Sequence, residues 1–215
     1  MTTTLERDTT TRAKLPDSKY ANGGGTDGVG AGRFHWTVEL FYRASDSGIF
    51  DEPKQWELID GDLWRRDELN PPHAFTTRKI GRLMRRLFEP TFLVQEEKPI
   101  HLAENSEPMP DVCVVADRDD EYASRHPVSE EVRLLIEVAD ATGIKDTGEK
   151  ADLYAQAGIA DYWVVLVNRR QINVYRAPEN GEYSSPRELR DGDTISPLAA
   201  PDVSIAVSDL LPPLE

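Results

Sequence analysis

Beyond residue 33, the chain alternates between segments with helical and strand-like spacing of apolar residues. Spacing of three and four predicts helices over residues 36–44, 74–88 and 148–157, with Gly158 as the residue that ends the last helix. Extended segments are predicted over residues 56–64, 91–100, 111–116, 133–139, 162–167 and 171–176, with a final strand or helical turn within 203–215. Several of these strands are apolar almost throughout, which is typical of a sheet covered on both faces. The pattern predicts a mixed α/β fold.

Two features of the sequence predict how neighbouring strands are connected. Asp60-Gly61 interrupts the segment 56–64 and predicts a tight hairpin. The segments 162–167 and 171–176 are close enough to pair as a second hairpin. Both predict antiparallel pairs of strands.

Residues 1–33 have a different character, because threonine, charged residues and then the run GGGTDGVGAG replace the apolar pattern. A glycine-rich phosphate loop would need a preceding strand and a Gly-Lys-Ser/Thr ending, and neither is present. We therefore interpret residues 1–33 as a disordered leader that cannot bury enough apolar surface to fold. Residues 34–215 are the predicted domain.

The charge of the chain is strongly acidic, with 25 basic against 39 acidic residues and a net charge of −14. This balance argues against non-specific coating of nucleic acids or anionic membranes, but it does not exclude a local basic surface. The single cysteine, Cys113, cannot form an internal disulfide and is predicted to pack in the core. With no apolar run long enough for a membrane span, we expect a cytoplasmic protein.

One local basic surface is predicted on the helix 74–88. Its polar side carries Arg78, Lys79, Arg82, Arg85 and Arg86. Such a run is either an ordinary solvated face or a contact surface for a phosphate backbone, and the helix pattern alone does not decide between them.

Two carboxylates stand out because they interrupt apolar strands. Glu137 lies within LLIEV, on the same strand face as Leu135 and Ala139, where an ionised group must be paired or bound to a metal. Asp111 follows Pro110 at the start of DVCVVA and would by itself suit a turn. If the two carboxylates converge, they could hold Mg²⁺.

Lys150 is the third candidate. The helix beginning near 148 has Asp146 as its predicted N-cap, which puts Lys150 in the first turn with Tyr154 one turn later on the same face. A lysine near a helix N-terminus is disfavoured by the helix dipole. Lys150 is either a solvated surface residue, or a carboxylate pair or a bound phosphate compensates its unfavourable interaction with the helix dipole.

The segments PDVCVVA and LLIEVADATGIKDTGEKADLYAQAGIADYWVVL resemble the Uma-two family of restriction endonucleases, a branch of the PD-(D/E)XK nuclease superfamily. WELIDGDLW and His73 resemble the opening segment of the family, and the resemblance spans residues 36–211. It implies a restriction-endonuclease-like mixed sheet flanked by helices. We leave the role of His73 open between a structural and a functional one.

The resemblance implies that Asp111 and Glu137 bind Mg²⁺ or Mn²⁺. Glu57 matches a further acid that some superfamily members use for metal, and it would equally suit an ordinary surface position on a strand. Ala139 occupies the position where the simplest superfamily pattern has its lysine, so Lys150 would take that role and orient the attacking water. Asp140 departs from the usual family residues and adds negative charge, and Met109 replaces a residue that is often basic.

The function implied is hydrolysis of DNA by a homodimer, with Arg78, Arg82, Arg85 and Arg86 on the phosphate backbone. The main alternative is a binding module with the nuclease fold and little or no turnover. Another is a metal-dependent hydrolase of RNA or nucleotides. The sequence leaves these three hypotheses open.

Overall fold

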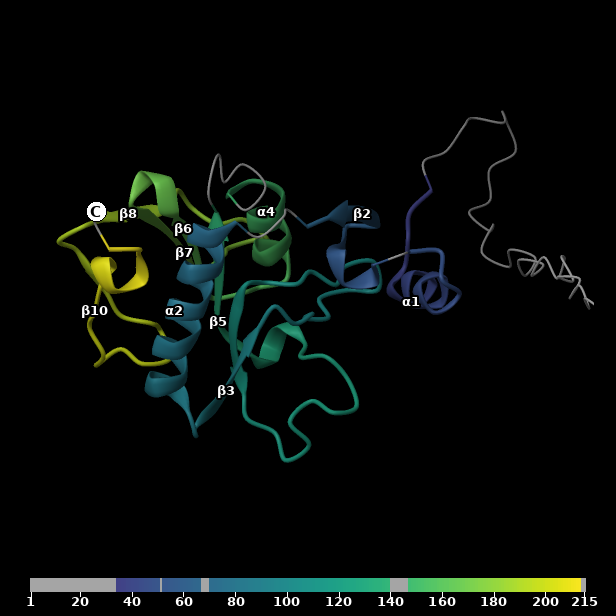
Figure 1. The fold of residues 1–215 in the computed structure, drawn as a ribbon, viewed down its shortest axis with the longest axis horizontal. Helices are drawn as coiled ribbons and strands as arrows, with labels where there is room; N and C mark the ends of the chain where they lie inside the picture. The colour runs from purple at the N-terminus through teal and green to yellow at the C-terminus, as the bar shows by residue number, and fades with distance from the viewer. Residues whose placement is uncertain (1–33, 51, 67–69, 140–146, 214–215) are drawn as a thin grey trace, which may run out of the picture. The chain divides into compact units, whose positions relative to one another are not determined.

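A computed structural model describes residues 34–50, 52–66, 70–139 and 147–213. Within them, a six-stranded sheet has the order β3-β4-β5-β6-β7-β8 (Figure 1). Its strands are β3 (Phe92–Glu96), β4 (Val112–Ala116), β5 (Val132–Ala139), β6 (Asp161–Leu166), β7 (Gln171–Arg176) and β8 (Arg187–Arg190). β5 and β6 run parallel, and the other neighbours pair antiparallel. The predicted mixed sheet is confirmed.

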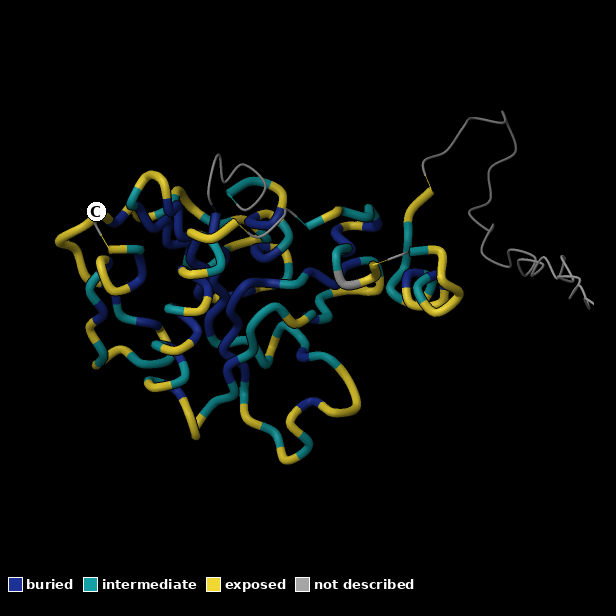
Figure 2. Tube along the Cα trace, viewed as in Figure 1, coloured by how far each residue is buried: buried dark blue, intermediate teal, exposed yellow. Residues whose placement is uncertain are grey.

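Each face of the sheet is covered by a helix, because successive side chains of β4, β5 and β6 point to opposite sides. On one face, Val114, Ile136 and Trp163 pack in a cluster with residues of α2 (Pro71–Phe88). On the other face, residues of these strands pack with Ala151 and Tyr154 of α4 (Glu149–Gln156). The central strands are accordingly deeply buried (Figure 2).

The predicted hairpin consists of β1 (Trp56–Ile59) and β2 (Asp62–Arg65). Its turn residues, Asp60 and Gly61, have φ angles of 48° and 78°, the left-handed conformation that both central residues of a type I′ turn adopt. The hairpin is tied to the segment before β4, since the Glu107 N–H donates to the Leu58 carbonyl at 2.8 Å. This hydrogen bond fixes where β1 presents its side chains.

The remaining elements are short. They are α1 (Val38–Asp46), β9 (Thr194–Ile195), β10 (Ile205–Ala206) and the 3₁₀ turns η1 (Pro53–Gln55), η2 (Ser129–Glu131), η3 (Val167–Arg169) and η4 (Val207–Leu210). The C-terminal segment, predicted to form a strand or a helical turn, contains both: β10 is followed directly by η4. No helix among the described residues is long and apolar enough to span a membrane.

The predicted start of the second helix is wrong by three residues. α2 begins at Pro71 rather than at residue 74, and Asn70 caps it by accepting the His73 N–H at 3.0 Å. In the sequence, two consecutive prolines suggest that a helix is interrupted. Proline nevertheless suits the first turn of a helix, because the N–H groups of that turn have no partner within the helix. The correction brings His73 into the first turn of α2.

Candidate functional site

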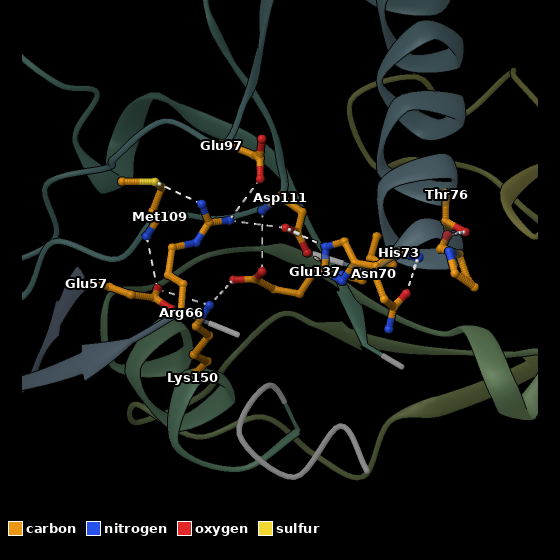
Figure 3. A network of polar contacts seen from close by, with 12 residues as sticks. Glu57, Arg66, Asn70, His73, Thr76, Glu97, Met109, Asp111, Glu137 and Lys150 are labelled. Carbon is orange, nitrogen blue, oxygen red and sulfur yellow. Dashed lines mark hydrogen bonds and ion pairs between the residues drawn. The ribbon is translucent and has the colours of Figure 1, made fainter. Parts of the chain in front are cut away.

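Carboxylates from separate parts of the sequence surround one lysine where β1, β5 and α4 meet (Figure 3). Lys150 Nζ lies 2.9 Å from Glu137 Oε1 and 3.1 Å from Glu57 Oε2. Both glutamates are 2% exposed and Lys150 is 4% exposed. Lys150 is thus not the solvated surface lysine considered as an alternative.

Asp111 joins this site through the register of the sheet. β4 and β5 pair antiparallel with Val112 opposite Ile136, so the residue preceding β4 lies beside Glu137. Asp111 Oδ2 accepts the Val138 N–H at 2.7 Å, and the Asp111 N–H donates to Glu137 Oε2 at 3.4 Å. The two strands therefore hold both carboxylates close together, and Asp111 is more than a turn residue.

α4 supplies two donors to the same carboxylate oxygen. Besides Lys150, the Tyr154 hydroxyl donates to Glu137 Oε1 at 2.9 Å from one turn further along the helix. Burial, followed by the negative charge of Glu137, raises the pKa of Tyr154 well above its usual value, so the hydroxyl keeps its proton. Gly148 is the N-cap residue of α4, while Asp140 and the predicted cap Asp146 lie outside the described residues.

Cys113 lies in the core on the same side of the sheet as this site. Burial and the charge of Glu137 raise the pKa of its thiol. A buried thiol that keeps its proton is a poor nucleophile and metal ligand. The prediction that Cys113 packs as a small hydrophobic residue is therefore consistent with its surroundings.

Glu57 is held in place by the β1 hairpin. Its Oε2 accepts the Met109 N–H at 3.2 Å as well as contacting Lys150. Met109 and Asp111 belong to the same segment, so the backbone that positions Asp111 also orients Glu57. The predicted acids Glu57, Asp111 and Glu137 and the predicted Lys150 all belong to one polar network (Figure 3).

The sequence interpretation missed Arg66 and left His73 without a role. Arg66 Nη2 lies 3.4 Å from Glu97 Oε1 and 3.5 Å from Asp111 Oδ1. His73 Nε2 lies 3.1 Å from the same Asp111 oxygen. Arg66 directly follows β2 and Glu97 directly follows β3. Both lie in connecting segments, which lack the apolar periodicity that identifies helices and strands. The family resemblance pointed to His73, and starting α2 at the prolines would have placed it in the first turn of the helix.

Carboxylates predominate among the side chains that the structure describes in this network. The described ion pairs join the carboxylates of Glu57, Glu97, Asp111 and Glu137 to Arg66, Lys150 and His73. A gathering of carboxylates is a setting that a divalent cation can occupy.

The donors also suit such an ion, because carboxylate oxygens are the preferred protein ligands of Mg²⁺. Across the described residues, no group of three or more His, Cys, Asp and Glu side chains is already arranged to hold a metal. Mg²⁺ commonly uses only one or two carboxylates and completes its shell with water, so a pair such as Asp111 and Glu137 fits its chemistry.

The basic surface of α2 divides into two sets of residues. Arg78, Arg82 and Arg86 are exposed and recur every four residues, forming one stripe along the helix. By contrast, Arg85 pairs with Glu96 on β3, and Lys79 donates to the Leu211 carbonyl at 2.7 Å. Lys79 and Arg85 thus fasten α2 to its neighbours, and the stripe is the solvent-facing part of the predicted surface.

The fold is similar to that of a solved structure. The crystal structure of "a putative nuclease belonging to DUF820" from Anabaena variabilis is 15% identical in sequence, with a TM-score of 0.67. The match covers 81% of this chain and 97% of that chain. At this identity the comparison establishes the fold alone, and the restriction-endonuclease-like fold class predicted from the sequence is confirmed.

The sequence comparison gives the family. Residues 38–208 match the family described as "Uma2: Putative restriction endonuclease". The chain therefore belongs to the Uma2 family, as its motifs predicted. The comparison with curated proteins finds no match.

The buried network predicts that Lys150 is required for stability. Lys150→Met would remove the cation that both Glu57 and Glu137 contact in the interior, and we expect a decrease of about 3–5 kcal/mol in the free energy of unfolding. Combining it with Glu57→Gln should cost less than the sum of the two single changes, because the pair is coupled. Chemical denaturation measures both effects.

Lys98→Met serves as the control, since Lys98 is exposed and its replacement should change stability by no more than about 0.5 kcal/mol. Equal destabilisation by Lys150→Met and Lys98→Met would show that the buried pairs contribute nothing.

Proposed function

We propose that this chain is a divalent-cation-dependent endonuclease that hydrolyses phosphodiester bonds in DNA. The observation that carries the proposal is the convergence of Asp111, Glu137 and Lys150 in one buried network. These residues come from different elements, and their joint position is what a metal-assisted hydrolase requires. Membership of a family described as restriction endonucleases supports nucleic acid as the substrate class.

In this proposal, Asp111 and Glu137 hold Mg²⁺ or Mn²⁺. The bound ion would polarise the scissile phosphate and lower the pKa of the attacking water. Lys150 would donate a hydrogen bond to that water and offset charge on the phosphate. Glu57 would keep the Lys150 ammonium oriented, as their 3.1 Å ion pair already does. Tyr154 would fix the Glu137 carboxylate through its 2.9 Å hydrogen bond.

The stripe of Arg78, Arg82 and Arg86 is the proposed contact surface for the DNA backbone. It starts just over one helical turn after His73, so it leads away from the site along α2. Arg85 is the weakest member of the predicted set, because its guanidinium is already paired. We also propose a homodimer, which would allow both strands to be cut.

The first prediction of this proposal is cation-dependent cleavage of supercoiled plasmid at low salt, with Mg²⁺ or Mn²⁺ and not with EDTA. Glu137→Gln and Asp111→Asn should each reduce the rate at least about a hundredfold, because the contribution of the ion is worth several kcal/mol. Glu104→Gln, an exposed glutamate, should leave the rate unchanged. Gel electrophoresis of the plasmid gives the rates.

Several results would contradict parts of the proposal. Cleavage that persists in both site variants would show that these residues are not the catalytic site. DNA binding without cleavage would favour the binding module, and cleavage of RNA alone would change the substrate. Nicked plasmid without linear product would count against a dimer that cuts both strands.

The second prediction concerns the arginine stripe. The triple variant Arg78→Ala, Arg82→Ala and Arg86→Ala should bind duplex DNA more weakly in EDTA. The slope of log K against log salt should become shallower by about 0.9 for each phosphate that an arginine no longer neutralises. Fluorescence anisotropy across a salt series measures this slope.

The control for this experiment replaces three exposed arginines elsewhere, Arg43, Arg187 and Arg190, and so changes the net charge equally. If the control and stripe variants weaken binding equally, the effect comes from net charge and not from the stripe.

A further inference from the structure

The imidazole of His73 faces the candidate site from the first turn of α2 (Figure 3). Its Nε2 lies 3.1 Å from Asp111 Oδ1, and the side chain is 16% exposed. The backbone of this turn is fixed, because Asn70 accepts the His73 N–H and prolines at 71 and 72 restrict the preceding residues. A capped helix end thus presents the ring to Asp111.

The two oxygens of Asp111 have different surroundings. Oδ2 accepts the Val138 N–H at 2.7 Å, whereas Oδ1 faces His73 and the Arg66 guanidinium. Arg66 also pairs with Glu97 at 3.4 Å, so its charge stays paired if Oδ1 takes another partner. Oδ1 is therefore the Asp111 atom best placed to bind a cation, and His73 is beside it.

We propose that His73 is itself a ligand of the divalent cation, next to Asp111 Oδ1, and that it biases the site toward Mn²⁺ and later transition ions over Mg²⁺. This inference rests on the proposed function, since it requires a cation at Asp111. Two ligand atoms in adjacent positions of an octahedral ion, each about 2.1 Å from it, lie about 3 Å apart. The separation between Nε2 and Oδ1 has this value.

The chemistry of the ligand gives the selectivity. Imidazole nitrogen is a common ligand of first-row transition ions, while Mg²⁺ prefers oxygen. A hydrogen bond from a protonated Nε2 would produce the same separation and would make His73 a positioning residue for Asp111. The two roles differ in one observable, which is direct bonding of nitrogen to the ion.

The test measures cation binding by the full chain without DNA. Isothermal titration with Mn²⁺ and with Mg²⁺ compares the wild type with His73→Gln, and electron spin echo spectroscopy detects nitrogen bonded to Mn²⁺. We expect nitrogen coupling in the wild type and none in His73→Gln. The Kd for Mn²⁺ should rise about tenfold or more and that for Mg²⁺ less than about threefold. His101→Gln, which removes a histidine that pairs with Glu107, should match the wild type.

The outcomes separate this inference from the proposed function. Mn²⁺ binding without nitrogen coupling in the wild type, or equal weakening of both cations by His73→Gln, overturns the ligand role and leaves the cation-dependent site standing. Absence of any cation binding and of DNA cleavage in the wild type overturns the proposed function and this inference together. If His73→Gln does not fold, absence of nitrogen coupling in the wild type still overturns the ligand role.

Discussion

The pairing of Lys150 with Glu57 and Glu137 in the interior is the interaction on which the rest of the candidate site depends. Buried carboxylates of like charge repel each other, and each loses hydration, so the arrangement is unfavourable without a cation. Lys150 supplies that cation from α4, and Arg66 supplies another beside Asp111. Together, Lys150 and Arg66 hold the described carboxylates of the site in place.

The fold determines this geometry through three connections. The antiparallel register of β4 and β5 sets Asp111 beside Glu137. The parallel pair β5 and β6 needs a crossover, and α4 lies in that crossover with Lys150 in its first turn. The bridge between Leu58 and Glu107 brings the β1 hairpin, and with it Glu57, to the same place. Each functional side chain thus belongs to an element fixed elsewhere by apolar packing or backbone pairing.

The sequence was enough to predict the main strands, the flanking helices and two of the acids. Glu137 and Asp111 were found because a carboxylate in or beside an apolar strand needs an explanation. Lys150 was singled out by its place in the first turn of a helix, and the family resemblance gave it a role. Glu57 was found by the resemblance alone, since a glutamate in a hairpin is an ordinary surface feature. Other features depend on the meeting of distant segments. The ion pair between Arg85 and Glu96 joins a helix to a strand, so the helical pattern alone did not reveal it.

In the proposed function, Asp111 and Glu137 of this network bind a divalent cation. Anomalous scattering of Mn²⁺ in crystals of the wild type and of Glu137→Gln would locate that cation. We predict an anomalous peak bounded by Asp111 and Glu137 in the wild type, and a much weaker one in the variant. A wild-type crystal with Mn²⁺ bound only elsewhere, such as at the exposed acids Asp117 and Asp119, would contradict this interpretation.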